Sequence, residues 1–128
     1  MPNREILIAD DERVIADTLA LILRTRGYTT KAVYSLEELQ RETADARPDL
    51  ILLDVRFQWD DSLSLAQELR ARGCRILLLS GDQATAERLQ QIEHQGVAPF
   101  DILPKPIHPH AVLEAVERAF AAPARNAS

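Results

Sequence analysis

Short aliphatic runs separated by amphipathic segments most restrict how this chain can fold. Residues 6–9, 50–53 and 76–79 are wholly aliphatic, and each run is followed by a segment with apolar residues at helical spacing. Such runs are typical of strands buried on both faces, because half-exposed strands alternate between apolar and polar residues. Strands of this kind that alternate with helices predict a parallel sheet covered by helices.

The strand-helix unit occurs five times along the chain. We expect strands at residues 5–10, 29–34, 49–55, 75–80 and 100–103. We expect the helices that follow them at 11–27, 35–46, 63–73, 82–96 and 108–120. The predicted class is α/β, a five-stranded doubly wound parallel sheet with helices on both faces and the aliphatic strands in the middle.

The helix boundaries carry their own signals. Ser35 and Glu38 have the spacing of a capping box, and Pro109 suits the first turn of the last helix. Three of the four glycines stand where helices are expected to end, at Gly27, Gly73 and Gly96. We expect one domain over residues 1–122, with 123–128 as a disordered tail.

Composition excludes several classes of protein. Apolar residues make up 46% and charged residues 27% of the 128 residues, as in ordinary globular domains. The net charge of −5 argues against a direct nucleic-acid interface. A single cysteine, Cys74, rules out an internal disulfide and suits a cytoplasmic protein. The charged N-terminus and the short aliphatic runs predict neither a signal peptide nor a membrane span.

Charged and polar residues stand at the ends of the expected strands. Asp10 and Asp11 end the first strand, Asp54 the third and Ser80 the fourth, and Lys105 follows the fifth. The carboxyl ends of parallel strands share one edge and adjacent strands are ~5 Å apart, so the three aspartates are expected to crowd together. A pair of carboxylates ~4 Å apart repels by about 1–4 kcal/mol.

A bound cation would relieve this repulsion. Any one aspartate alone could simply cap a helix or end a strand. Three together, beside a lysine and a hydroxyl, favour a Mg²⁺ site, because Mg²⁺ binds one or two carboxylates, waters and a phosphate oxygen.

Four segments, ILIADDE, LILLDVR, ILLLSG and ILPKP, occur in this order on four of the expected strand ends. In this arrangement the chain resembles the receiver domain of bacterial response regulators, from residue 4 to about residue 122. The resemblance implies the flavodoxin-like strand order 2-1-3-4-5 and a signalling switch rather than an enzyme.

The resemblance also implies a set of metal ligands. Asp11 would bind Mg²⁺ directly and Asp10 largely through water. Asp54 and the backbone carbonyl of Arg56 would complete the protein's share of the coordination.

Phosphoryl chemistry is implied for the remaining site residues. Asp54 would accept the phosphoryl group as a carboxylate nucleophile. The Ser80 hydroxyl would hydrogen-bond that group, and Lys105 would pair first with Asp54 and then with the phosphate. A cis peptide bond between Lys105 and Pro106 would steer the lysine inward.

The implied partners follow from this chemistry. The phosphoryl donor would be a sensor histidine kinase, a phosphotransfer protein or a small acyl phosphate, and hydrolysis of the Asp54 phosphate would reset the switch. The signal would pass to a downstream protein target, with no direct nucleic-acid or membrane contact, and a homodimer is compatible with the sequence. Whether the chain acts alone or is part of a longer regulator or hybrid kinase stays open.

The chain departs from the usual receiver pattern in several places. Gln58 and Ser62 stand where proline and glycine are typical, and Trp59 adds an aromatic that either packs over the loop or contacts a partner. Ile102 replaces the usual tyrosine or phenylalanine, and we expect it to be a permanent core residue. The His-Pro-His segment at 108–110 is expected to start a helix rather than bind zinc.

Three other functions share part of this pattern. A receiver-like scaffold that is never phosphorylated would keep the fold, and the altered loop leaves it open. A metal-dependent aspartyl-phosphate phosphatase of the haloacid-dehalogenase type would carry a D-x-D arrangement at the first strand, where this chain has adjacent aspartates. A flavodoxin-like flavin carrier would need a Ser/Thr/Gly loop there to hold phosphate.

Overall fold

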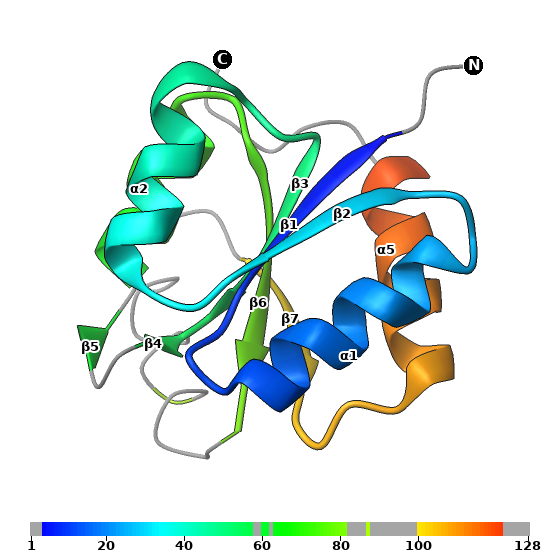
Figure 1. Ribbon diagram of the computed structural model, residues 1–128. Coiled ribbons are helices and arrows are strands. Elements are labelled where there is room, and N and C mark those ends of the chain that lie inside the picture. The colour runs from blue at the N-terminus through cyan, green and yellow to red at the C-terminus, as the bar shows by residue number, and fades with distance from the viewer. Residues whose placement is uncertain (1–3, 58–59, 62, 82–86, 88–99, 122–128) are drawn as a thin grey trace.

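The aliphatic runs of the sequence form the middle of a five-stranded parallel sheet (Figure 1). The computed structural model describes residues 4–57, 60–61, 63–81, 87 and 100–121. The sheet order is β2-β1-β3-β6-β7. When only the five strands of this sheet are numbered along the chain, this is the predicted order 2-1-3-4-5, which is confirmed. The bounds are β1 (Glu5–Ala9), β2 (Thr29–Val33), β3 (Leu50–Asp54), β6 (Arg75–Ser80) and β7 (Asp101–Pro104).

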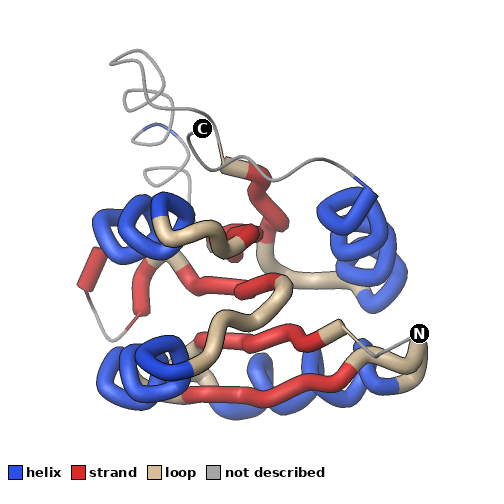
Figure 2. The backbone as a smooth tube through the Cα atoms, turned by 90° about the horizontal axis from the view of Figure 1, so that it is seen from above, coloured by secondary structure: helices blue, strands red, loops and turns tan. Residues whose placement is uncertain are grey.

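Helices cover both faces of this sheet, as predicted (Figure 2). Helices α1 (Arg13–Arg24) and α5 (Pro109–Ala121) pack together on one face, while α2 (Leu36–Asp45) and α3 (Leu63–Ala71) lie on the other. The helix predicted at 82–96 and the tail predicted at 123–128 lie outside the residues that the structure describes, apart from Glu87.

Every residue of β3 is buried, because its two faces pack against different helices. Leu50 and Leu52 point toward the layer formed by α1 and α5, whereas Ile51 and Leu53 point toward α2 and α3. Each such side chain stabilises the fold by about 1.5–3 kcal/mol through burial. The central strand is therefore a rigid support for the residue at its end, Asp54.

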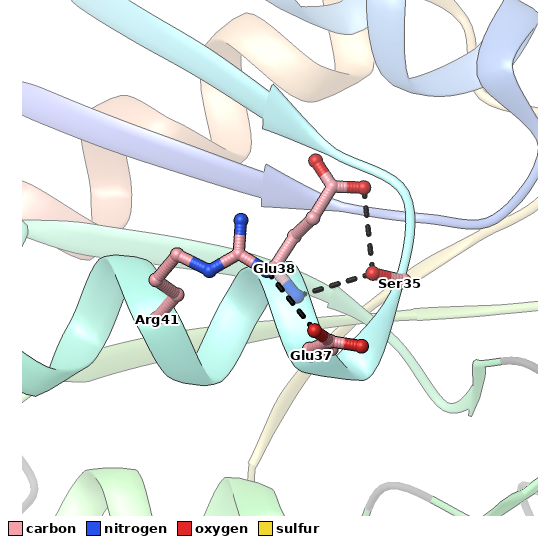
Figure 3. Close-up of polar contacts among 4 residues, drawn as sticks. All are labelled: Ser35, Glu37, Glu38 and Arg41. Carbon is pink, nitrogen blue, oxygen red and sulfur yellow. Dashed lines mark hydrogen bonds and ion pairs between the residues drawn. The ribbon is translucent and has the colours of Figure 1, made fainter.

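The predicted capping signals are confirmed at Ser35, Gly27 and Gly73, while α1 is shorter than its predicted range of 11–27. At the start of α2, the Ser35 hydroxyl oxygen accepts a hydrogen bond from the Glu38 backbone N–H at 3.1 Å (Figure 3). Glu37 and Arg41 form an ion pair one turn apart, 3.2 Å between Oε1 and Nη2. Gly27 and Gly73 end helices at φ of 88° and 95°, a conformation that favours glycine.

Two features differ from the prediction. A short antiparallel pair, β4 (Arg56–Phe57) and β5 (Asp60–Asp61), follows Asp54 and was not predicted.

The prediction that Ile102 is a permanent core residue is wrong, because its side chain is 41% exposed. Its strand, β7, forms the edge of the sheet, and of its four residues only Leu103 is buried. The nearby Phe100 is buried instead, and the Arg70 Cζ atom lies 3.8 Å from the centroid of its ring.

Candidate functional site

The carboxyl ends of the strands bring the predicted site residues to one edge of the sheet. Asp54 is the last residue of β3 and Ser80 the last of β6, and Asp10 directly follows β1. The Asp10 backbone N–H donates to Val33 O at 3.2 Å, which extends the pairing of β1 with β2. The Lys105 N–H donates to Ser80 O at 2.8 Å, which fixes the start of the lysine side chain at the same edge.

Three carboxylates lie close together at this edge. Asp10, Asp11 and Asp54 each offer an oxygen atom, and these atoms all lie within 4.8 Å of one another. Asp10 is fully buried and Asp54 is 6% exposed, while Asp11 is half-buried. Their mutual repulsion is therefore only weakly screened by water, and this edge of the sheet attracts a cation.

The donor atoms fit a small divalent cation. Asp10 Oδ1 accepts a hydrogen bond from the Glu12 N–H at 2.9 Å, which holds the carboxylate in place. Its Oδ2 is buried, and the Lys105 ammonium is the described group that lies against it, at 2.9 Å. A buried carboxylate oxygen of this kind is suited to coordinate Mg²⁺, either directly or through a water molecule.

The Lys105 ammonium is the counter-charge of this cluster. Its Nζ lies 2.9 Å from Asp10 Oδ2, 3.5 Å from Asp54 Oδ2 and 3.6 Å from Glu12 Oε1. Burial alone would lower the pKa of this amine, but the bond to Asp10 and the negative charges of Asp54 and Glu12 outweigh burial and raise the pKa. Lys105 is therefore charged at neutral pH, and the predicted cis bond from Lys105 to Pro106 is confirmed.

The other predicted residues are Ser80, Arg56 and the residues of the loop after Asp54. Ser80 is buried at the end of β6, on the strand next to Asp54. Arg56 begins β4, two residues after Asp54, and its carbonyl as a metal ligand stays a prediction. Gln58, Trp59 and Ser62, where the loop departs from the usual pattern, lie outside the described residues.

The sequence reasoning assigned no role to Glu12. It is the third acidic residue in a row after the first strand, and that run was the available signal. Its backbone caps the start of α1, but its side chain makes no capping hydrogen bond. The side chain instead lies within ion-pair distance of Lys105.

The two histidines act as the sequence predicts for a helix start. The His110 backbone N–H donates to His108 Nδ1 at 3.1 Å, and His110 Nε2 lies 3.0 Å from Glu114 Oε1, one turn along α5.

Within the described part of the chain, no helix has the length and apolar character needed to cross a bilayer.

Comparisons with known proteins agree with this geometry. Response regulator MprA of Mycobacterium ulcerans (strain Agy99) is 32% identical over 103 residues, 79% of this chain and 43% of that protein. The chain spans less than half the length of the curated relatives it matches. The CheY-like receiver domain protein from Methanospirillum hungatei JF-1 superposes with a TM-score of 0.80 at 19% identity, covering 94% of this chain and 95% of that one.

A second solved structure adds chemical information. This crystal structure contains a response regulator protein from Burkholderia pseudomallei with a phosphorylated aspartic acid, calcium ion and citrate. Its TM-score is 0.70 at 26% identity, and the match covers 94% of this chain and 76% of that one. The family model described as the response regulator receiver domain matches residues 6–117. The chain therefore belongs to the response regulator receiver domain family, whose members generally act as switches in phosphorylation-based signalling rather than as enzymes.

Proposed function

We propose that this receiver domain accepts a phosphoryl group on Asp54 in a Mg²⁺-dependent reaction and thereby switches its contacts with another protein. One observation carries the proposal. Asp54 ends a fully buried strand, with oxygens of Asp10 and Asp11 within 4.8 Å and the Lys105 ammonium 3.5 Å from its Oδ2. A nucleophile, a cation site and a fixed positive charge meet at one point, as phosphoryl transfer requires.

Receiver domains generally bind Mg²⁺ at an acidic pocket, and the acidic cluster here fits that ion. Asp11 would hold Mg²⁺ directly and Asp10 largely through water, with Asp54 and the Arg56 carbonyl as further ligands. The ion would neutralise the carboxylates and the charge on the phosphoryl oxygens. The Burkholderia relative, named for a phosphorylated aspartic acid and a calcium ion, supports this combination by analogy.

The transfer itself needs little from the protein beyond position and charge. A carboxylate oxygen of Asp54 attacks the phosphorus atom of the donor, and the bond from phosphorus to the donor's leaving nitrogen or oxygen breaks with its electron pair. A leaving imidazole then takes up a proton from solvent. The Ser80 hydroxyl donates to a phosphoryl oxygen, and Lys105 exchanges its carboxylate contact for the new phosphate.

The donor in the cell would be a sensor histidine kinase or a phosphotransfer protein in the cytoplasm. Receiver domains of response regulators usually interact with histidine kinases. The match covers less than half of the longer curated relatives, so domains of this type occur within larger regulators. A downstream protein that distinguishes the two states of Asp54 would be the recipient of the signal.

Incubation with acetyl phosphate and Mg²⁺ tests the proposal. Intact-mass spectrometry should show one added phosphoryl group in the parent protein, and none in Asp54→Ala or when Mg²⁺ is removed with EDTA. Asp45→Ala, which removes an exposed carboxylate at the end of α2, is the matched control and should still be modified. A parent protein that stays unmodified would contradict the proposal and favour the scaffold alternative.

A further inference from the structure

Lys105 and Mg²⁺ compete for the same oxygens in this site. The ammonium lies against Asp10 Oδ2 and Asp54 Oδ2, which belong to the two most buried members of the carboxylate cluster. Mg²⁺ coordinates carboxylate oxygens at about 2.0–2.1 Å. A metal bound to this cluster would therefore lie near a like-charged ammonium unless the ammonium shifts to another partner.

Glu12 is the partner that remains. Its Oε1 lies 3.6 Å from Lys105 Nζ, and its side chain is 65% exposed, on the outer side of the cluster. Glu12 is not one of the three carboxylates that can share a cation. It is thus the one described acidic group that touches Lys105 without also belonging to the candidate metal site.

The backbone holds Glu12 in a suitable position for this task. Its N–H is bonded to Asp10 Oδ1, and its carbonyl accepts the first hydrogen bond of α1, from the Ala16 N–H at 3.1 Å. The main chain of Glu12 is therefore fixed on both sides. Its side chain makes no capping bond to the helix, so it is available to the lysine.

We propose that Glu12 is a positioning residue that receives the Lys105 ammonium when Mg²⁺ enters the site, and so lowers the cost of metal binding. This inference rests on the proposed function, because it takes the three aspartates as the Mg²⁺ site. In the metal-free protein Lys105 neutralises Asp10, and in the loaded protein Glu12 holds the lysine at the edge of the site, ready for the phosphoryl group.

Metal titration of Glu12→Gln provides the first test. The variant should bind Mg²⁺ about two- to five-fold more weakly than the parent, the range of a partly exposed ion pair. Isothermal titration calorimetry measures the affinities, and Glu117→Gln, an exposed acidic residue on α5, controls for the loss of one negative charge. In a Lys105→Met background, the Glu12 substitution should have little effect. An equal loss in both backgrounds would mean that Glu12 attracts the metal directly, and would overturn the proposal.

Lysine reactivity gives a second readout that does not require the Lys105 variant to fold. The chain has two lysines, and Lys31, paired with Glu42 at 2.6 Å, serves as the internal standard. Trace acetylation with acetic anhydride, read by peptide mass spectrometry, reports the ratio of Lys105 to Lys31 labelling. Saturating Mg²⁺ should raise this ratio several-fold in Glu12→Gln but not in the parent. The same ratio in both proteins would contradict the role of Glu12. A parent that binds no Mg²⁺ at all would instead refute the proposed function.

Discussion

The two ends of the sheet differ in how their charged side chains are arranged. At the carboxyl end, Asp10, Asp11 and Asp54 crowd together around one half-buried ammonium, that of Lys105. At the amino end, cationic side chains stack on an aromatic ring. The Cζ atoms of Arg4 and Arg75 lie 4.3 Å and 5.8 Å from the centroid of the Phe120 ring.

At the amino end, the charged side chains have partners within the protein. Tyr28 packs against the same ring, with 5.7 Å between the centroids, so Phe120 joins the end of α5 to the starts of β1, β2 and β6. Cation–π contacts satisfy the arginines without burying a carboxylate. The carboxyl end instead keeps three carboxylates close together, two of them buried, which costs stability and supports the proposed cation site. The comparison indicates that the amino end serves the fold, and it agrees with the proposal that the carboxyl end serves the chemistry.

The largest effect is expected from removing the counter-charge at the carboxyl end. Lys105→Met keeps most of the apolar stem but leaves Asp10 and Asp54 buried without an ammonium. Breaking a buried pair in this way destabilises a protein by about 3–5 kcal/mol. Urea unfolding in EDTA should show this loss, and Mg²⁺ should recover a larger share of stability in the variant than it adds to the parent. A variant as stable as the parent in EDTA would show that the cluster is not strained.

A smaller loss is expected at the amino end. Phe120 is half-buried, so Phe120→Ala should destabilise the protein by about 2 kcal/mol, less than the 3–5 kcal/mol of a fully buried ring. Because the two ends share no partners, the stabilisation that Mg²⁺ adds should be the same as in the parent. Thermal melts with and without Mg²⁺ measure both quantities. A changed Mg²⁺ response in Phe120→Ala would mean that the two ends are coupled.

The smallest effect concerns Tyr34, at the carboxyl end of β2. Its hydroxyl donates to Asp17 Oδ1, and this bond, with burial and the Asp17 charge, raises the pKa of Tyr34 above its usual 10.0. Since the native pKa is the higher one, this contribution is fully present below about pH 10 and is lost as the pH rises through the native value. It should be worth less than about 1 kcal/mol, as for a partly exposed hydrogen bond.

Comparison of the parent with Tyr34→Phe isolates that contribution. The difference in their unfolding free energies should be constant from pH 7 to pH 9 and should shrink in more alkaline solution, while ultraviolet absorbance follows phenolate formation. Asp17→Asn, which removes the acceptor charge, should bring Tyr34 ionisation to lower pH. If the difference in unfolding free energy grew with pH, the assignment of a raised pKa to Tyr34 would be wrong.

Sequence patterns were sufficient for the parallel sheet and most of the site. Aliphatic runs on β1, β3 and β6 have few alternatives to a doubly buried strand, and parallel strands bring their carboxyl ends together whatever the helices do. The gathering of Asp10 and Asp54 at one edge follows from these two facts, and the resemblance to receiver domains added the strand order that makes their strands neighbours. The capping box at Ser35 is local, so it too could be read directly from the sequence.

Features that depend on side-chain reach or on edge position could not be read in the same way. The contact of Glu12 with Lys105 joins residues far apart in the chain, through flexible side chains that periodicity does not constrain. Ile102 was expected in the core from its apolar character, but it lies on the edge strand β7, where its side chain is 41% exposed. The β4–β5 pair is too short for an alternating pattern to be recognised.

Mg²⁺ titration of the melting temperature tests the central claim most directly, namely that the crowded carboxylates are a cation site. A ligand that binds only the native state stabilises it by about 2.7 kcal/mol at a hundredfold excess over Kd. The parent should therefore melt at increasing temperature as Mg²⁺ is added. Asp11→Asn should lose most of this dependence and be at least as stable as the parent in EDTA, because one repelling charge is gone. A parent whose melting temperature is indifferent to Mg²⁺ would contradict the claim.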